Sequence, residues 1–185
     1  GGNYNVVVGD EAGTAITTGD QNTFVGYAAG DATTTASNNN ALGRYALTSN
    51  TTGAQNIAIG VNSLFTNTTG TDNVAVGHNA LTANTTASNN TAIGRSALGA
   101  NTTGDQNVAV GANAGLSVTT GVQNTLIGYL AGDALTDADY NVALGATALG
   151  ADTLGSRAVA IGRNALSAQN FTSATDNYNV AVGFS

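Results

Sequence analysis

A glycine returns at every seventeenth position along most of this chain, and this strict period constrains the fold more than any other feature. Each glycine closes a five-residue block such as Asn73-Val74-Ala75-Val76-Gly77, and eleven such blocks are present. The glycines are Gly9, Gly26, Gly43, Gly60, Gly77, Gly94, Gly111, Gly128, Gly145, Gly162 and Gly183. The first ten are spaced by 17 residues and the last step is 21. A period held over so many copies is typical of a solenoid, in which each copy forms one coil.

Each block has the pattern of a short β-strand. The residue before the glycine is bulky and aliphatic in every copy, as at Ile59, Val76 and Ile93. The residue before that is Ala in most copies, and the exceptions are Val7, Phe24 and Leu126. Period-two alternation with β-branched residues predicts a strand. We expect the bulky column to face a core and the Ala column to face the other way, against something that approaches closely.

A second pattern follows the glycine: two variable residues, then Ala or Ser, then either Leu or Gly. The Leu copies have Leu47, Leu64, Leu81, Leu98, Leu149 and Leu166, and the Gly copies have Gly13, Gly30, Gly115 and Gly132. Leu copies mostly carry Asn three residues later, whereas Gly copies mostly carry an aliphatic residue there. This linkage predicts that each coil receives one apolar plug by either of two routes, because every coil must fill the same cross-section.

A Thr/Gly turn such as Thr51-Thr52-Gly53 leads into the next block. Each unit is therefore expected to contain a strand, a glycine corner, a second short strand and this turn. Eleven flat coils stacked at ~4.8 Å would make a rod about 50 Å long. The block-leading asparagines should then form a ladder of amide hydrogen bonds. They include Asn56, Asn73, Asn90 and Asn107.

The whole chain is predicted to be a single repeat array. The longer last step places a loop insertion at about 167–177 on the turn edge. The chain contains no Met, and we expect it to be a piece of a longer fibre.

Composition narrows the functional classes. The chain has no Pro and no Cys, and its one histidine is His78. Without a His/Cys cluster there are no ligands for zinc or copper, and we expect no metal and no cofactor. A net charge of −7 argues against nucleic acid and anionic lipid as partners. No apolar run has membrane-spanning length, so we expect no membrane insertion by this segment.

The chain is also predicted to associate with copies of itself. One coil offers only three or four apolar side chains, which is a thin core for an isolated chain. Stacked Leu and Ala columns would leave apolar stripes along the rod, and such stripes favour association. We predict a parallel homo-oligomer, a trimer about the rod axis.

Blocks such as Asn56-Ile57-Ala58-Ile59-Gly60 and Asn90-Thr91-Ala92-Ile93-Gly94, followed two residues on by Ser or Ala, resemble the head repeats of YadA-like trimeric autotransporter adhesins. Similar repeats occur in phage tail-fibre proteins. The resemblance covers nearly the whole chain. It implies a left-handed parallel β-roll, three chains side by side, in an extracellular fibre on a bacterial surface or virion. The unit of 17 residues is longer than the usual coil of that family, and the Thr-Thr-Gly turn is the apparent addition.

The two variable positions after each glycine are the candidates for contact with a receptor. Residues that vary inside a rigid repeat are not dictated by packing, and Tyr and Arg are common interface anchors. The candidates are Tyr27, Arg44, Tyr45, Arg95 and Tyr129. A solvated rim is an equally good interpretation of these positions.

Other chemistry has weaker support. Asp133, Asp137 and Asp139 could approach one another and bind calcium, although the usual β-roll calcium motif is absent. Asn-x-Thr sequons at Asn50, Asn67, Asn84, Asn101 and Asn170 recur because the turn recurs. The threonine column from Thr17 to Thr153 resembles the hydroxyl ranks of ice-binding solenoids.

Two functional hypotheses remain. The first is a non-enzymatic fibre segment that gives rigid length and attaches to a host glycan, a host protein or extracellular matrix. The second is a module whose own face recognises carbohydrate or ice.

Overall fold

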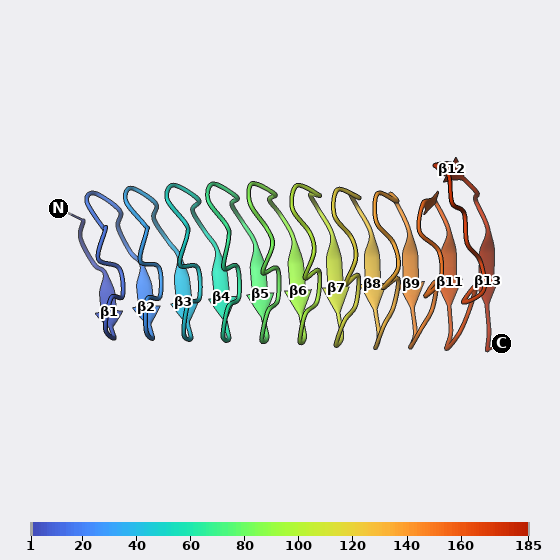
Figure 1. Cartoon of the computed structure of the whole chain (residues 1–185), viewed down its shortest axis with the longest axis horizontal. Helices are drawn as coiled ribbons and strands as arrows, with labels where there is room; N and C mark the ends of the chain where they lie inside the picture. Colours follow the sequence, from blue (N-terminus) through green and yellow to red (C-terminus); the bar gives the residue numbers. More distant parts are fainter. Residues whose placement is uncertain (1, 185) are drawn as a thin grey trace.

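The chain folds into a parallel β-solenoid. The structure, a computed structural model, describes residues 2–184. Figure 1 shows the coils side by side in one row, with the two ends of the chain at opposite ends of the rod. One eleven-stranded sheet runs the length of the row in the order β1-β2-β3-β4-β5-β6-β7-β8-β9-β11-β13. Its strands are β1 (Val6–Val8), β2 (Thr23–Val25), β3 (Asn40–Leu42), β4 (Ile57–Ile59), β5 (Val74–Val76), β6 (Thr91–Ile93), β7 (Val108–Val110), β8 (Thr125–Ile127), β9 (Val142–Leu144), β11 (Val159–Ile161) and β13 (Val180–Val182).

The register of the sheet confirms the predicted stacking. Val74, Ala75 and Val76 of β5 pair with the residues 17 positions later in β6, so that Val76 lies against Ile93. The same offset holds along the sheet until β11 pairs with β13 across the longer last step. Like residues therefore meet like residues along the rod.

The expected second strand of each coil is absent from the regular part of the described chain. The backbone instead turns twice after the glycine corner, with φ of 58° at Tyr45 and 55° at Leu47. Coils still bond to one another there, since Leu47 N donates to Ser63 O at 3.0 Å and Thr51 N donates to Thr68 O at 2.9 Å. The prediction failed because a left-handed residue every second position cannot extend into a strand.

The predicted orientation of the main strand was wrong. Ala58, Ala75 and Ala92 are fully buried, whereas Ile59 and Ile93 are 38% and 40% exposed. The coil is too narrow for a bulky residue on the strand, because a buried leucine fills it from the opposite wall. The Ala column therefore faces the core, and the bulky column, with Val76 half-buried in it, covers an outer face.

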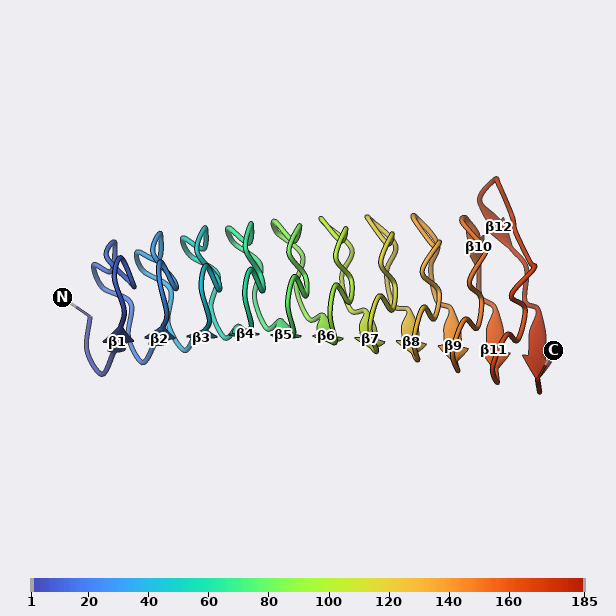
Figure 2. The same cartoon turned by 60° about the horizontal axis from the view of Figure 1, so that its bottom comes forward.

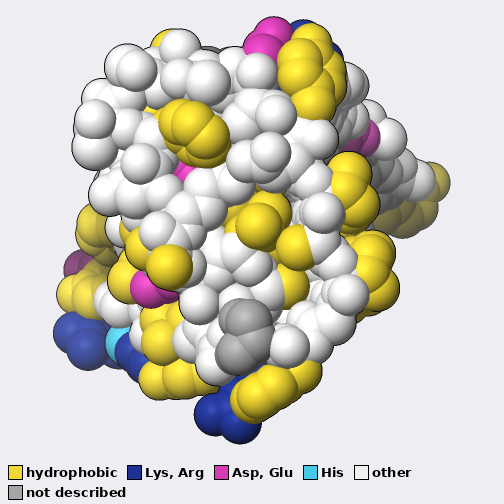
Figure 3. Space-filling view, turned by 90° about the vertical axis from the view of Figure 1, so that its right-hand side faces the viewer, with side chains coloured by type: hydrophobic (Ala, Val, Ile, Leu, Met, Phe, Trp, Pro, Cys, Tyr) yellow, Lys and Arg dark blue, Asp and Glu magenta, His cyan; other side chains and the backbone are white. Residues whose placement is uncertain are grey.

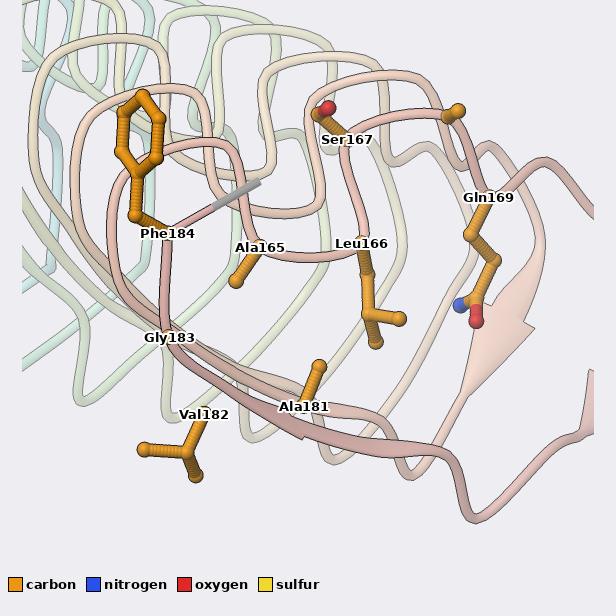
Figure 4. A pocket seen from close by; sticks show the side chains of 9 residues that line it. Ala165, Leu166, Ser167, Gln169, Ala181, Val182, Gly183 and Phe184 are labelled. Atoms are coloured by element: carbon orange, nitrogen blue, oxygen red, sulfur yellow. The ribbon is translucent and has the colours of Figure 1, made fainter.

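The last coil shows the direction of these side chains directly, because it is the uncovered end of the core. Figure 4 looks into its interior, where Ala181 of β13 points toward Leu166 and Val182 points away from it. Ser167, Gln169 and Phe184 complete the margin of an open hollow of about 410 Å³. The hollow is the uncovered end of the core and has the same lining pattern as the interior of every other coil.

The predicted exchange between two repeat positions that supply the apolar plug is confirmed, and the strand column is a third position that can supply it. Leu47, Leu64, Leu81, Leu98 and Leu149 are fully buried in the Leu coils, as are Val118 and Leu135 in two Gly coils. Phe24 and Leu126 are the large residues of the strand column. A Cβ on Gly30 would lie 2.5 Å from the Phe24 ring, and one on Gly132 would lie 2.7 Å from Leu126. A coil thus has either Leu at the corner with Ala on the strand, or Gly at the corner with room for a larger strand residue.

The strand-end glycine is required by both conformation and space. Gly77 has φ of 138°, a region that residues with a Cβ rarely adopt. A Cβ at this position would lie 2.5 Å from the carbonyl oxygen of Gly94 in the next coil. Gly60 and Gly94 repeat this geometry, which explains why the column admits no other residue.

The predicted asparagine ladder is confirmed. The Asn73 backbone N donates to Asn56 Oδ1 at 3.1 Å, and Asn73 Nδ2 donates to Ala87 O at 2.8 Å. Asn90 and Asn107 continue the series through their backbone N–H groups. A second ladder joins the asparagines of the Leu copies, with Asn84 Nδ2 donating to Asn67 Oδ1 at 2.7 Å. These bonds supply partners for amides that are fully removed from water.

Candidate functional site

The candidate contact residues all lie at the corner where the main strand ends. The first residue after each glycine accepts a hydrogen bond through its carbonyl from the second residue of the next coil. Tyr45 N donates to Tyr27 O at 2.9 Å, and Ser96 N donates to His78 O at 2.9 Å. Because this bond repeats, the side chains at the first position form one column beside the outer face of the sheet.

Three of the candidates form an aromatic cluster in the first coils. The rings of Tyr27 and Tyr45 meet edge to face at 5.3 Å, and the Arg44 guanidinium lies 4.5 Å from the Tyr45 ring. Phe65 extends the cluster at 5.9 Å from Tyr45. The sequence analysis missed Phe65, which lies at a later position of the repeat. A Glu11 hydrogen bond is the main cause that raises the pKa of the Tyr27 phenol to about 12.

The other two candidates lie farther along the same column. Arg95 and Tyr129 are exposed, and neither contacts the aromatic cluster through a ring interaction within residues 2–184. The candidates therefore share a line along the rod and do not converge on one pocket. Figure 3, an end-on view, shows dark-blue basic side chains beside the cyan histidine at one corner of the rod.

A second cluster, on the turn edge, was not predicted. Arg157 forms an ion pair with Asp176 at 3.0 Å. Its guanidinium lies 4.6 Å from the Tyr140 ring and 5.8 Å from the Tyr178 ring. The hydrogen bond to Asp176 and the negative charge of that carboxylate raise the pKa of the Arg157 guanidinium. Tyr140, Arg157 and Tyr178 are separated by 17 and 21 residues, which are the spacings of successive coils. The repeat spacing could therefore have predicted that they lie together.

This cluster fastens the predicted insertion to the stack. Residues 167–177 rise beyond the neighbouring coils at the C-terminal end of the rod, as Figure 2 shows. Two short strands, β10 (Gly155–Ser156) and β12 (Thr175–Asp176), pair in parallel there. The location on the turn edge agrees with the prediction, and the added strand pair is new.

The hypothesised calcium site is not formed. Among residues 2–184 no three acidic or histidine side chains come together as metal ligands. Asp137 accepts from Thr120 Oγ1 at 2.5 Å, and Asp139 accepts from the Val122 backbone N at 2.7 Å. Asp133 lies apart from both, and its partial burial raises the pKa of its carboxyl. These aspartates join one coil to the next.

The threonine column and most sequons are also used by the fold. Thr68 Oγ1 donates to Thr85 O at 3.0 Å, and the same bond runs from Thr17 to Thr136. A hydroxyl that donates to the next coil is not free to act in a row of surface hydroxyls. Asn50, Asn67, Asn84 and Asn101 are fully buried, so their amides are inaccessible for glycosylation in the folded chain. Asn170 is exposed, and so is Asn89, which begins the further sequon Asn89-Asn90-Thr91.

The outer face of the main sheet presents half-exposed apolar side chains along the rod. Leu42, Ile59, Ile93 and Leu144 are between 38% and 52% exposed. A shallow hollow of about 430 Å³ lies on this face between the first and third residues of β2, β3 and β4. The predicted stripes therefore exist, but they consist of the bulky strand columns, because the Leu and Ala columns are buried.

Comparison with known protein families, with characterised proteins and with solved structures gave no match for this chain. The described residues include no helix with the length and hydrophobicity needed to cross a bilayer.

Proposed function

We propose that this chain is a non-enzymatic segment of an extracellular fibre, on a bacterial surface or a virion, that provides rigid length and attaches to host glycan, host protein or matrix. The single observation that carries the proposal is the in-register stack of coils along one axis. The regular coils bond to their neighbours through backbone, Asn and Thr groups, so length is added without flexible joints.

The outer face of the sheet supports the proposal that the functional form is an assembly of several copies of the chain. A parallel sheet is normally covered on both faces, and here one face holds half-exposed Val, Ile and Leu. Ile59 and Ile93 lie on this face, and Ile57, Val74 and Val108 form a second apolar column beside them. Three copies about a common axis would remove these columns from water and leave the turn edges outside.

Light scattering coupled to size-exclusion chromatography tests the assembly. The proposal predicts a mass of three chains, against the 18.1 kDa of one chain. Ile59→Ser and Ile93→Ser together should dissociate the assembly, because each places a hydroxyl at the apolar face. A matched pair on the turn edge, Thr69→Ser and Thr103→Ser, should leave the mass unchanged. A stable monomer of the unmodified chain would refute the trimer.

Attachment is tested separately from assembly. If the segment acts as a spacer, replacing its coils with an equal number of consensus coils should preserve attachment of the parent fibre. If its own face binds the target, the same replacement should abolish attachment.

A further inference from the structure

The basic residues of the chain are concentrated in one line. Three of the four arginines and the only histidine occupy the first position after the strand-end glycine, and we call this set the basic ridge. It consists of Arg44, His78, Arg95 and Arg163, all exposed. Within residues 2–184 the one ion pair involves Arg157 on the turn edge. The ridge arginines therefore have no carboxylate partner in an ion pair among the described residues.

The acids lie mostly on the opposite edge. Six of the eleven acidic residues occupy the turn edge or the insertion, namely Asp20, Asp72, Asp105, Asp137, Asp139 and Asp176. Asp10 and Glu11 lie at the N-terminal end of the corner columns. From Arg44 onward the ridge thus presents positive charge on a chain of net charge −7, and a line of one sign attracts the opposite sign locally.

A hollow adjoins the middle of the ridge. It has a volume of about 400 Å³, and Asn79, Ser96 and Ser117 are among its lining residues. Asn79 and Ser96 directly follow His78 and Arg95 of the ridge. Volumes of ~300–1,000 Å³ are typical of small-molecule sites.

A glycine lines this hollow where both neighbouring coils have a larger residue. Gly99 lines it, and the equivalent residues in the coils on either side are Thr82 and Leu116. Gly99 is not one of the glycines with a positive φ. A Cβ on Gly99 would lie 3.2 Å from Ser96 O and 3.3 Å from Leu116 Cδ1. The φ of Gly99 therefore does not require glycine, although a Cβ there would press on Ser96 and Leu116.

Aromatic side chains extend the same line. Tyr27 and Tyr129 occupy ridge positions on either side of the hollow and are 39% and 56% exposed. An aromatic ring with a polar tip offers an apolar face to a sugar ring and a hydroxyl for hydrogen bonding. Arg and Tyr side chains in one line, beside a hollow that Asn79 and Ser96 help to line, match a ligand that is long, hydroxylated and anionic.

We infer that the basic ridge and its hollow bind a linear polysaccharide with sparse carboxylate groups, laid along the rod with one sugar in the hollow beside Gly99. The inference rests on the proposed attachment role and names its ligand class. Arg44 and Arg95 are three coils apart, ~14 Å, and Arg95 and Arg163 are four coils apart, ~19 Å. Duplex DNA carries one charge per ~1.7 Å, so widely spaced arginines fit a sparsely charged glycan better than a nucleic acid.

The test measures binding of the intact chain to immobilised hyaluronan, which has one carboxylate in each disaccharide. Dextran is the neutral control and single-stranded DNA the dense polyanion. We expect binding to hyaluronan that weakens with salt, weaker binding to DNA and none to dextran. Arg44→Gln with Arg95→Gln should weaken hyaluronan binding by at least about tenfold, the equivalent of about 1.4 kcal/mol. Gly99→Thr, which copies Thr82, should weaken it by filling the hollow.

Arg157→Gln is the control, because it replaces the one arginine that lies off the ridge, on the turn edge. It should change hyaluronan binding less than about twofold, the scatter expected of an unrelated surface change. Equal losses for Arg157→Gln and the ridge variants, tighter binding to DNA, or no binding to hyaluronan would each overturn the inference. Light scattering on every variant separates the two proposals, since a trimer that fails to bind refutes the ligand and leaves the fibre intact.

Discussion

The regular coils, residues 22–150, and the last turn, residues 151–184, solve the same stacking problem in different ways. In the regular coils buried asparagines pass hydrogen bonds from coil to coil, and a leucine or its substitute fills each interior. In the last turn Ala158 replaces the ladder asparagine, and buried Asp152 accepts from Gly155 N and Phe171 N instead. The insertion is then fastened on the surface by the ion pair of Arg157 with Asp176.

The difference shows which contacts the stack requires. Backbone pairing continues through the last turn, since Val159 N still donates to Asn179 O at 2.8 Å. Side-chain ladders and core plugs are lost there, and exposure rises to 74% at Val182. We therefore expect substitutions of equal chemistry to cost much more in the regular coils than in the last turn.

The largest contrast is expected at the strand-end glycine. Gly77→Ala combines backbone strain with a Cβ 2.5 Å from Gly94 O, whereas a Cβ on Gly183 has no neighbour within 4 Å. Strain of ~1–3 kcal/mol applies to both, and overpacking adds ~1–3 kcal/mol at Gly77. Urea denaturation followed by circular dichroism should rank Gly77→Ala as the more damaging change. Equal losses of unfolding free energy would mean that coil contact at the glycine is unimportant.

The apolar plug gives the next contrast. Leu81→Ala should lower the free energy of unfolding by ~2–5 kcal/mol, because Leu81 is fully buried. Leu166→Ala in the last turn should cost less than half of that, since Leu166 is only half-buried beside the open hollow. Thermal denaturation of both variants checks the ranking. A larger cost at Leu166 would contradict the view that the last turn is the weaker part.

The asparagine ladder provides a third contrast. Asn73→Ala leaves the Asn90 backbone N without its partner, and the Ala87 carbonyl keeps only its bond from Asn84 Nδ2. Each buried unsatisfied group costs ~1–3 kcal/mol. Asn170→Ala removes only an exposed 3.2 Å bond from Thr153 Oγ1 and should be almost neutral. The same denaturation measurements test the pair, and a neutral Asn73→Ala would show that the ladder is dispensable.

The surface ion pair should have the smallest effect. Arg157→Gln and Asp176→Asn should each change the global free energy of unfolding by less than ~1 kcal/mol, because both side chains are about half exposed. The response should be local, with faster hydrogen exchange of amides in residues 170–178 and unchanged exchange in β5 and β6. Faster exchange throughout the rod would mean that the insertion supports the whole stack.

Much of this fold could be predicted from the period alone. The register of β5 with β6, the amide ladder at Asn73 and the position of the insertion follow from stacking equal units. The inward face of the strand could not be predicted in this way. Alternation separates two faces without saying which is inside, and the decision depends on the width of the coil that Leu81 already fills.

The candidate site was only partly predictable. Variable positions after Gly26 and Gly43 correctly placed Tyr27, Arg44 and Tyr45 on one corner. The contact with Phe65 depends on how far side chains from different repeat positions reach, and no period encodes that distance. The hollow beside Gly99 was not predicted, because the sequence does not distinguish a glycine that lines a hollow from one that the backbone conformation requires.

The central claim, that successive coils lie flat on one another in register, is tested most directly by distances between spin labels on exposed turn residues. Cysteine labels at Thr18 and Thr86 are separated by four coils, and labels at Thr18 and Thr120 by six. With labelled chain diluted in unlabelled chain, pulsed electron resonance should give ~19 Å and ~29 Å between the labelled backbone positions. Distances that fail to increase in proportion to the number of coils would contradict the stack.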